Sequence, residues 1–471
     1  MSQEKAKPKS EINITRVLIT IAVGVIVAFI PPPTGLTVLS MRYLGIFLAM
    51  IIGMVINAAP TWVVSTLSAL AMVGFKLTSM SKVMANYAGS TVWMLLAVMG
   101  FAGCVAQSGL MKRIAFNVLK FFPPTFTGQV LAISAASIVL TPLIPSTSAK
   151  LAVLAPFTAS IAAETGLEPH SKGLKGLTFS LFNICFVGAF AVLTGSNGNF
   201  ILLGFVPAAE AASFTWMYWF RASIVWWIVL VVCSILVSIF FFQPEKPINM
   251  SADFIKSRLA ELGPMSMDEK ICMATLIGAV GMWMTESMHG VSSAVVAWLA
   301  FTVMIFRGLF TSRDVGTKLP WGLILFFASM MGVVDYMGES GLTGWIAELL
   351  GPIVGKVIPN AFVFVIVLTV VTWLIRLGVD SISILAINVA IFGPVATLLG
   401  INPWLVVWLT FVNGQQWILP HNQIQLLQCS AMMGGVIDHK DMQGMTWFYM
   451  IISLAGSLIS VPVWVAMGLI A

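Results

Sequence analysis

Charged residues are scarce in this sequence. Only 9% of its 471 residues are Asp, Glu, Lys or Arg, whereas 59% are hydrophobic. Soluble domains carry roughly 25% charged residues, so this composition excludes a soluble domain of useful size. The longest polar stretch, about residues 243–270, is short enough to be a linker. The sequence therefore predicts a polytopic membrane protein.

Cysteine is also rare, and its copies lie singly in apolar runs. Without a C-x-x-C pair or a Cys/His cluster, the pattern favours neither a metal centre nor a disulfide. The net charge of +6 is not gathered in a basic amphipathic arm, so no nucleic-acid partner is expected, and neither is an organic cofactor. The isolated cysteines are Cys104, Cys185, Cys233, Cys272 and Cys429.

The apolar segments divide the chain into two similar parts. Residues 1–16 form a Lys-rich tail without a cleavage site, which the positive-inside rule places in the cytoplasm. We predict a first repeat at 17–242, a cytoplasmic linker at 243–270 and a second repeat at 271–471. Within the linker, Ser251–Leu262 has apolar residues on one face, which predicts a short interfacial helix.

Weak internal similarity supports the two repeats. The tripeptide Ser-Gly-Leu occurs at Ser108–Leu110 and again at Ser340–Leu342, and a polar interruption follows each copy at a nearly equal distance. Several apolar segments in both halves are too short to span a bilayer, which is typical of re-entrant hairpins and broken helices. An odd number of spans per half would invert one repeat relative to the other. We therefore predict an all-α protein with two inverted repeats, two re-entrant hairpins and broken transmembrane helices.

Two of these interruptions carry most of the polar character. The first, Leu143–Pro156, places Ser146, Thr147 and Ser148 in a row between two prolines, and the second is Arg376–Ala386. Polar residues and a broken backbone at membrane depth are costly unless they line an enclosed cavity. We expect the two stretches to face each other and to hold a solute.

Each of these stretches is followed by another interruption, at Leu193–Asn199 and at Asn413–Gln423. Glycine and proline there are expected to unwind a helix, which frees carbonyl groups for a small cation. The next half-helix offers N–H groups and a positive dipole end to an anion. Four unwound points in two pairs suit two cation sites flanking one anion. Kinked helices with satisfied polar groups are the structural alternative.

These motifs resemble the divalent anion/sodium symporter family, which includes dicarboxylate, citrate and sulfate carriers. That family has a Ser-Asn-Thr motif at each hairpin tip and an unwound Gly-Thr-Pro-Pro-Asn motif after it. Ser146–Ala149 resembles the first tip, and Gly195–Asn199 has the Gly-Thr-x-x-Asn spacing. Asp380–Ser383 stands at the second tip, and Pro420–Asn422 matches the end of the second unwound motif.

The resemblance implies a secondary transporter of small organic dianions, with a C4 dicarboxylate as first choice and sodium as the coupling ion. It also implies a homodimer in a bacterial inner membrane, in which a transport domain of hairpins and broken helices slides against a scaffold as an elevator. The expected substrate-binding residues are Ser146, Thr147, Ser148, Lys150, Asn199, Ser381, Ser383, His421 and Asn422. The expected sodium-binding residues are Ser146, Ser148, Gly195, Ser196, Asn197, Asp380, Ser383, Gln416 and Pro420.

Four charged or titratable side chains have more than one interpretation. Lys150 lies one helical turn after Ser146 and could pair with a substrate carboxylate or with a protein group. Arg376 and Asp380 are four residues apart, so a structural ion pair on a helix is favoured over ion binding. His421 could couple transport to protons, although a buried hydrogen-bonding histidine is favoured.

Other functions remain open as alternatives. The protein could be an anion exchanger, or a proton-coupled carrier of a tricarboxylate or sulfonate. An anion channel would need an open path, whereas paired broken helices suggest alternating access. Gly338–Gly341 fits the Gly-x-Ser-Gly pattern of rhomboid-type intramembrane serine proteases, with His421 as the one candidate partner. The equivalent turn at Ser108 favours a duplicated structural turn, so an enzyme is not expected.

Overall fold

The computed structural model describes residues 12–248, 251 and 254–471, and the regular secondary structure of this part of the chain is helical, with one isolated bridge between Ile401 and Ile470. Six helical stretches in it are long and apolar enough to cross a bilayer. The prediction of an all-α membrane protein is therefore confirmed. The six stretches are Val38–Val55, Ser90–Gln107, Lys172–Ala191, Trp216–Phe241, Trp321–Glu339 and His439–Ala466.

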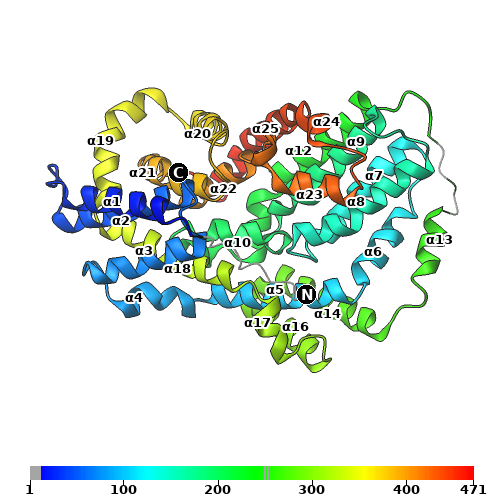
Figure 1. Ribbon diagram of the computed structural model, residues 1–471, viewed down its shortest axis with the longest axis horizontal. Helices are drawn as coiled ribbons and strands as arrows, with labels where there is room; N and C mark the ends of the chain where they lie inside the picture. Colours follow the sequence, from blue (N-terminus) through cyan, green and yellow to red (C-terminus); the bar gives the residue numbers. More distant parts are fainter. Residues whose placement is uncertain (1–11, 249–250, 252–253) are drawn as a thin grey trace, which may run out of the picture.

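The first half and the linker contain helices α1 to α13 (Figure 1). They are α1 (Ile14–Phe29), α2 (Val38–Val55), α3 (Thr61–Gly74), α4 (Met80–Met84), η1 (Ala85–Ala88), α5 (Ser90–Gln107), α6 (Leu110–Leu119), α7 (Phe126–Leu140), α8 (Thr147–Glu164), α9 (Lys172–Leu181), the π-helix η2 (Phe182–Val187), η3 (Gly188–Ala191), η4 (Leu193–Gly195), α10 (Asn197–Leu203), α11 (Ala208–Ser213), α12 (Trp216–Phe241) and α13 (Phe254–Glu261).

The second half contains helices α14 to α25. Its helices are α14 (Met267–Met284), α15 (Glu286–His289), α16 (Ser293–Phe306), α17 (Ser312–Lys318), α18 (Trp321–Glu339), α19 (Leu342–Val357), α20 (Ala361–Ile375), α21 (Ser383–Leu398), α22 (Pro403–Asn413), η5 (Pro420–Asn422), α23 (Ile424–Met432), α24 (His439–Gln443) and α25 (Thr446–Ala466).

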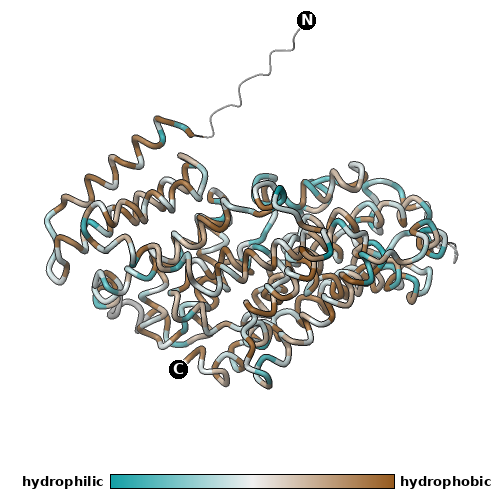
Figure 2. Tube along the Cα trace, turned by 90° about the horizontal axis from the view of Figure 1, so that it is seen from below, coloured by the Kyte–Doolittle hydropathy of each residue, from teal (hydrophilic) through white to brown (hydrophobic). Residues whose placement is uncertain are grey.

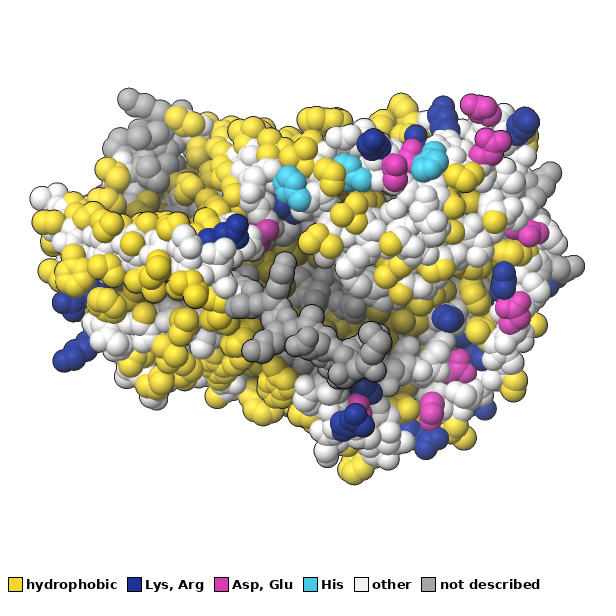
Figure 3. Space-filling model, viewed as in Figure 1, with side chains coloured by type: hydrophobic (Ala, Val, Ile, Leu, Met, Phe, Trp, Pro, Cys, Tyr) yellow, Lys and Arg dark blue, Asp and Glu magenta, His cyan; other side chains and the backbone are white. Residues whose placement is uncertain are grey.

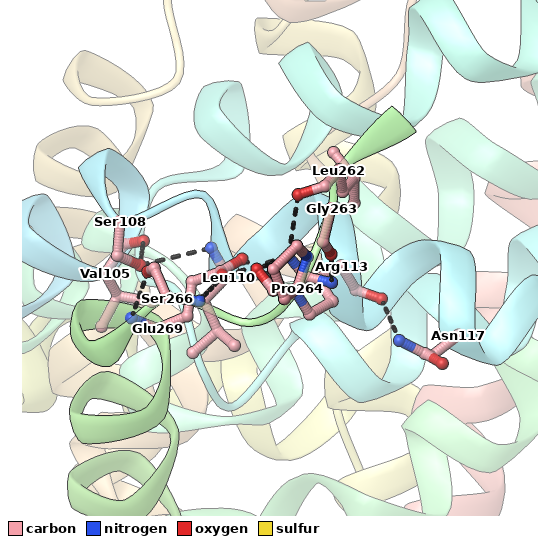
Figure 4. Close-up of polar contacts among 10 residues, drawn as sticks. All are labelled: Val105, Ser108, Leu110, Arg113, Asn117, Leu262, Gly263, Pro264, Ser266 and Glu269. Atoms are coloured by element: carbon pink, nitrogen blue, oxygen red, sulfur yellow. Dashed lines mark hydrogen bonds and ion pairs between the residues drawn. The ribbon is translucent and has the colours of Figure 1, made fainter. Parts of the chain in front are cut away.

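The duplicated Ser-Gly-Leu turn has the same hydrogen bonds in both halves. The Ser108 hydroxyl donates to the Val105 carbonyl (2.8 Å) and accepts from the backbone N–H of Leu110 (3.2 Å), as Figure 4 shows. Ser340 makes the equivalent bonds to the residues three before and two after it, at 2.7 and 3.2 Å. The glycine after each serine has a positive φ, +85° and +75°. Ser340 is thus a structural turn residue, as the internal repeat predicted.

Arg113 on α6 fastens the linker to the second half (Figure 4). Its guanidinium pairs with Glu269 at the start of α14 (2.9 Å) and donates to the carbonyls of Leu262, Gly263 and Pro264. The helix predicted in the linker is present over Phe254–Glu261, and its place at the membrane interface remains a prediction. Its predicted start lies beside residues 249–250 and 252–253, which are outside the described residues. Most of the predicted cytoplasmic tail, residues 1–11, is also outside them.

Helices of the two halves interleave in space. Helix α3 packs on α18 and α5 on α16, whereas α12 packs on α25 and α8 on α23. In Figure 1, α1–α4 lie toward one end of the long axis and α6–α9 toward the other. Charged side chains gather toward the end that carries α9 and α13 (Figure 3), and apolar residues follow most helices (Figure 2). The predicted domain limits remain a prediction.

Gly100 allows α5 to approach α16 closely. A Cβ atom at Gly100 would lie 2.4 Å from the ring of Phe301. We expect Gly100→Val to destabilise the protein by about 1–3 kcal/mol through overpacking, seen as a lower melting temperature in detergent. Gly103→Val, one turn later on α5, is the matched control, because nothing lies within 4 Å of its Cβ position. Equal melting temperatures for the two variants would contradict this interpretation.

Candidate functional site

The first hairpin turns between α7 and α8. Pro142 and Pro145 stop the helix there, and Ser146 begins the next one by accepting a hydrogen bond from the backbone N–H of Ala149 (3.2 Å). The Pro145 carbonyl accepts from the backbone N–H of Asn197 (2.7 Å). The tip is thereby tied to the unwound segment Leu193–Asn199, as expected for one composite site.

Lys150 lies one turn into α8 and is fully buried. Its ammonium donates to the carbonyl of Gly195 in the unwound segment (2.8 Å). Gly195 has no room for a side chain, because a Cβ atom would lie 2.3 Å from the carbonyl oxygen of Ala189. Among the described residues, no carboxylate forms an ion pair with Lys150, so its positive charge is balanced by a carbonyl dipole alone.

The second hairpin turns between α20 and α21 around Arg376, which is 2% exposed. The guanidinium donates through Nε to the Gly414 carbonyl (3.0 Å) and through Nη1 to the Val379 carbonyl (2.7 Å). Through Nη2 it reaches the Ser381 hydroxyl (2.8 Å) and the Asn422 carbonyl. Arg376 thus joins the second tip to the second unwound segment, as Lys150 does in the first half.

The expected ion pair between Arg376 and Asp380 is wrong. Residues 376–382 are turn rather than helix, and the structure has no ion pair between these two side chains. Asp380 instead accepts hydrogen bonds from the backbone N–H groups of Ile382 (2.9 Å) and Ser383 (3.1 Å) and from the Ser383 hydroxyl. It therefore caps the start of α21, where a carboxylate is favoured.

A cavity of about 280 Å³ lies between the two tips. The prediction that the two interruptions face each other is confirmed. The first half contributes Thr147, Phe186, Phe190, Ser196, Asn197, Gly198 and Ile201. The second contributes Arg376, Asp380, Ser381, Ile382, Phe411, Gln415, His421, Asn422, Gln423, Ile424 and Gln425.

The predicted site residues fall into two groups. Those that line the cavity are Thr147, Ser196, Asn197, Asp380, Ser381, His421 and Asn422. Those outside its lining are Ser146, Ser148, Lys150, Gly195, Asn199, Ser383, Gln416 and Pro420. Ligand binding by either group remains a prediction.

Asn199 and Gln416 of the second group brace the unwound segments. The Asn199 amide donates to the carbonyls of Val192 (2.7 Å) and Leu193 (3.3 Å), and Gln416 donates to the Trp373 carbonyl (2.9 Å). Such contacts fasten the unwound segments to the neighbouring backbone.

His421 differs from the favoured interpretation of a buried histidine. Its side chain is exposed at the cavity edge, and its Nε2 lies 3.1 Å from the Leu377 carbonyl oxygen.

Several lining residues had no predicted role. Phe186 and Phe190 come from the end of the first broken helix, and Phe411 comes from α22. Gln415 and Gln423 bond to each other (2.9 Å). The sequence does show that Phe182, Phe186 and Phe190 are spaced four residues apart. Such spacing in an apolar run usually indicates packing in the core, so it did not identify Phe186 and Phe190 as cavity residues.

Sodium binding by the predicted residues remains a prediction, and the carbonyl of one of them, Gly195, already accepts a hydrogen bond. Unwound carbonyls were expected to coordinate the ion, yet Gly195 already accepts from Lys150, and Gly414 and Asn422 already accept from Arg376. A sodium ion on the same oxygens would lie beside a fixed positive charge, which Coulomb repulsion opposes.

A polar clasp holds the loop after α8 against the start of α24. His170 donates its backbone N–H to the Val436 carbonyl (2.9 Å), and its Nδ1 lies 2.6 Å from Asp441 Oδ2. Lys175 pairs with the other oxygen of Asp441 (3.1 Å). The hydrogen bond to Asp441 raises the pKa of His170 above its ordinary value.

The clasp is expected to loosen as the pH rises. Because the pKa of His170 is raised in the folded state, the contribution of its protonated form is full below the ordinary histidine pKa and is lost as pH passes the raised value. Hydrogen exchange of residues 165–171 is expected to be faster at pH 9 than at pH 6, after correction for intrinsic rates. His170→Asn is expected to remove this pH dependence, and a difference that persists in the variant would refute the assignment.

Comparison with known proteins places this architecture in a family. The family model described as "sodium:sulfate symporter transmembrane region" matches residues 11–467. The chain is 26% identical to a chloroplastic dicarboxylate transporter of Spinacia oleracea over 360 residues, 74% of this chain and 63% of the spinach protein. It is 24% identical to a putative malate transporter of Bacillus subtilis (74% of each chain) and 24% identical to an L-tartrate/succinate antiporter of Shigella dysenteriae (77% and 79%).

A solved structure shares the fold. The crystal structure of the Alcanivorax borkumensis YdaH transporter matches with a TM-score of 0.55 and 16% identity, over 91% of this chain and 98% of that one. Family and relatives are transporters, so the expectation that the protein is not an enzyme is confirmed, and so is the family resemblance seen in the hairpin motifs. The chain belongs to the sodium:sulfate symporter family of integral membrane transporters.

Proposed function

We propose that this protein carries small organic dianions, a C4 dicarboxylate first among them, across a bacterial inner membrane by one-for-one exchange. The observation that carries the proposal is the pair of protein cations beside one cavity. Lys150 and Arg376 hold the carbonyls of the two unwound segments that were expected to coordinate mobile cations. The relatives named for dicarboxylates, malate and tartrate/succinate support the substrate class.

Fixed cations favour exchange for an electrostatic reason. An ammonium buried with a single carbonyl partner is poorly solvated, and an anion in the neighbouring cavity lowers that cost. The loaded site therefore crosses the membrane more easily than the empty one. A carrier of this kind returns only when it has picked up a second anion.

Movement of the site is proposed to follow an elevator. The cavity is built from the two tips and the two unwound segments, which belong to helices that pack on one another across the halves. In this proposal they move together against the group containing α3, α5, α16 and α18, and the latter group holds the contact of a homodimer. A tricarboxylate or sulfonate is the alternative cargo.

Sodium symport is the competing function, because the family as a whole is named for it. Proton symport through the exposed His421 is a second competing function, because protons carried with the substrate would offset the negative charge of a dianion. Exchange requires an anion on both sides of the membrane, sodium symport requires a sodium gradient, and proton symport requires a proton gradient.

Counterflow in proteoliposomes separates these functions. We expect uptake of labelled succinate into vesicles preloaded with unlabelled succinate and almost no uptake into empty vesicles. Replacing sodium by choline is expected to leave the uptake into preloaded vesicles unchanged. Vesicles without protein give the background. Uptake into empty vesicles that is driven by a sodium gradient would refute exchange and support symport, and uptake driven by a proton gradient would support proton coupling.

A further inference from the structure

Three phenyl rings form one side of the cavity, and we call them the aromatic wall: Phe186, Phe190 and Phe411. Phe186 and Phe190 are four residues apart, so they project from one side of the broken helix. The backbone between Phe182 and Val187 is a π-helix, a feature that is frequent at functional sites. Phe411 comes from α22 of the other half, so the wall crosses the boundary between the repeats.

The wall is held rigidly by its neighbours. The rings of Phe190 and Phe411 meet edge to face with centroids 4.7 Å apart, and Phe186 lies 5.5 Å from Phe190. Phe411 also packs on Gly198 of the first unwound segment, where a Cβ atom would lie 2.8 Å from the ring. The rings therefore present a preformed apolar surface rather than a loose filling of the cavity.

Polar groups approach the same cavity from both hairpin tips. The first tip and its unwound segment present Thr147, Ser196 and Asn197, and the second presents Ser381 and Asn422. A ligand that satisfies both sides needs anionic ends for the tips and an apolar body for the wall. Ligand pockets commonly combine an apolar lining with a few polar groups of this kind.

The volume of the cavity favours a body larger than a two-carbon chain. A cavity of about 150 Å³ is enough to bind benzene, whereas this one measures about 280 Å³. The difference leaves space for two carboxylates beside a ring. Succinate would leave much of the wall uncovered.

We infer that the preferred substrate is an aromatic dicarboxylate, whose ring lies against Phe186, Phe190 and Phe411 while its carboxylates reach the hairpin tips. This inference rests on the proposed function of dianion exchange, and it puts an aromatic dicarboxylate ahead of the C4 dicarboxylate as the preferred dianion. Aromatic pairs prefer edge-to-face or offset contacts, and the wall offers both faces and edges.

Binding to the purified full-length protein tests the inference. Isothermal titration is done with benzene-1,3-dicarboxylate, succinate and benzoate. We expect the aromatic dicarboxylate to bind at least about tenfold more tightly than succinate, because ring contacts add to the same carboxylate contacts, and benzoate to bind more weakly than the dicarboxylate. Phe190→Leu is expected to lower the affinity for the aromatic ligand by about tenfold and the affinity for succinate by a clearly smaller factor.

Phe364→Leu is the matched control, because Phe364 is equally buried and packs on Phe392 (6.1 Å) outside the cavity lining. Phe186→Leu replaces Phe190→Leu if the latter fails to fold. Succinate binding as tightly as the aromatic ligand would overturn the inference and leave the proposed function standing, and so would equal losses for both ligands in the wall variants. Absence of binding by both dicarboxylates would instead refute the proposed function.

Discussion

Replacing Arg376 with lysine is expected to reduce transport by at least about 100-fold, although the charge is kept. Arg376 serves four acceptors at once, and the flexible ammonium of lysine has no planar fork with which to reach them all. Each buried acceptor left unpaired costs about 1–3 kcal/mol, so the second tip would separate from its unwound segment. Counterflow of succinate in proteoliposomes measures the loss, and the melting temperature in detergent is expected to fall as well.

Arg307→Lys is the control for this variant. Arg307 pairs with Asp268 at 2.8 Å but is 43% exposed, and exposed pairs contribute about 0–1 kcal/mol. Normal transport and stability are expected there. Wild-type counterflow by Arg376→Lys would mean that the hydrogen bonds of the fork do not hold the site together.

Replacing Lys150 with methionine is expected to abolish exchange while making the ligand-free protein more stable. The change leaves the Gly195 carbonyl unpaired at a cost of about 1–3 kcal/mol. It also removes a buried ammonium that lacks a carboxylate partner, and the penalty for burying such an ion is several kcal/mol. The net effect is expected to stabilise, by about 1 kcal/mol or more. Loss of the fixed positive charge is expected to lower counterflow about 100-fold.

Lys150→Met is informative because its stability is expected to rise while its counterflow is expected to fall. A lysine kept only for structure would lower the melting temperature when removed, with transport falling in proportion. Lys172→Met tests for general effects of removing a lysine, because Lys172 is exposed near the start of α9. Retained exchange in Lys150→Met, or a lower melting temperature with exchange intact, would contradict the role proposed for its charge.

Much of the fold follows from local patterns in the sequence. The hairpin tip at Ser146 is set by proline and an N-cap serine, and both are visible in the sequence. The Ser-Gly-Leu turns at Ser108 and Ser340 were recognisable because they recur and because glycine permits a positive φ. These features depend on a few neighbouring residues, which is why sequence reasoning found them.

Partners distant in the chain were not predictable in the same way. A spacing of four residues suggested that Arg376 pairs with Asp380, but the backbone leaves the helix there and the guanidinium turns to carbonyls 38 and 46 residues away. Lys150 was left with two possible partners, and its contact with Gly195 is 45 residues away. Phe411 joins a wall whose other rings come from the first half.

The sequence by itself determined that this protein is a helical membrane transporter with two repeats and a polar site at four breaks in its helices. Lipid cannot solvate polar groups, so a polar break in an apolar segment marks a protein-lined cavity whatever the details of folding. Only the tertiary structure decided which groups donate hydrogen bonds to the unwound carbonyls and which rings line the cavity. Those choices depend on how helices from both repeats pack against one another, and the packing placed protein cations where mobile ones were expected.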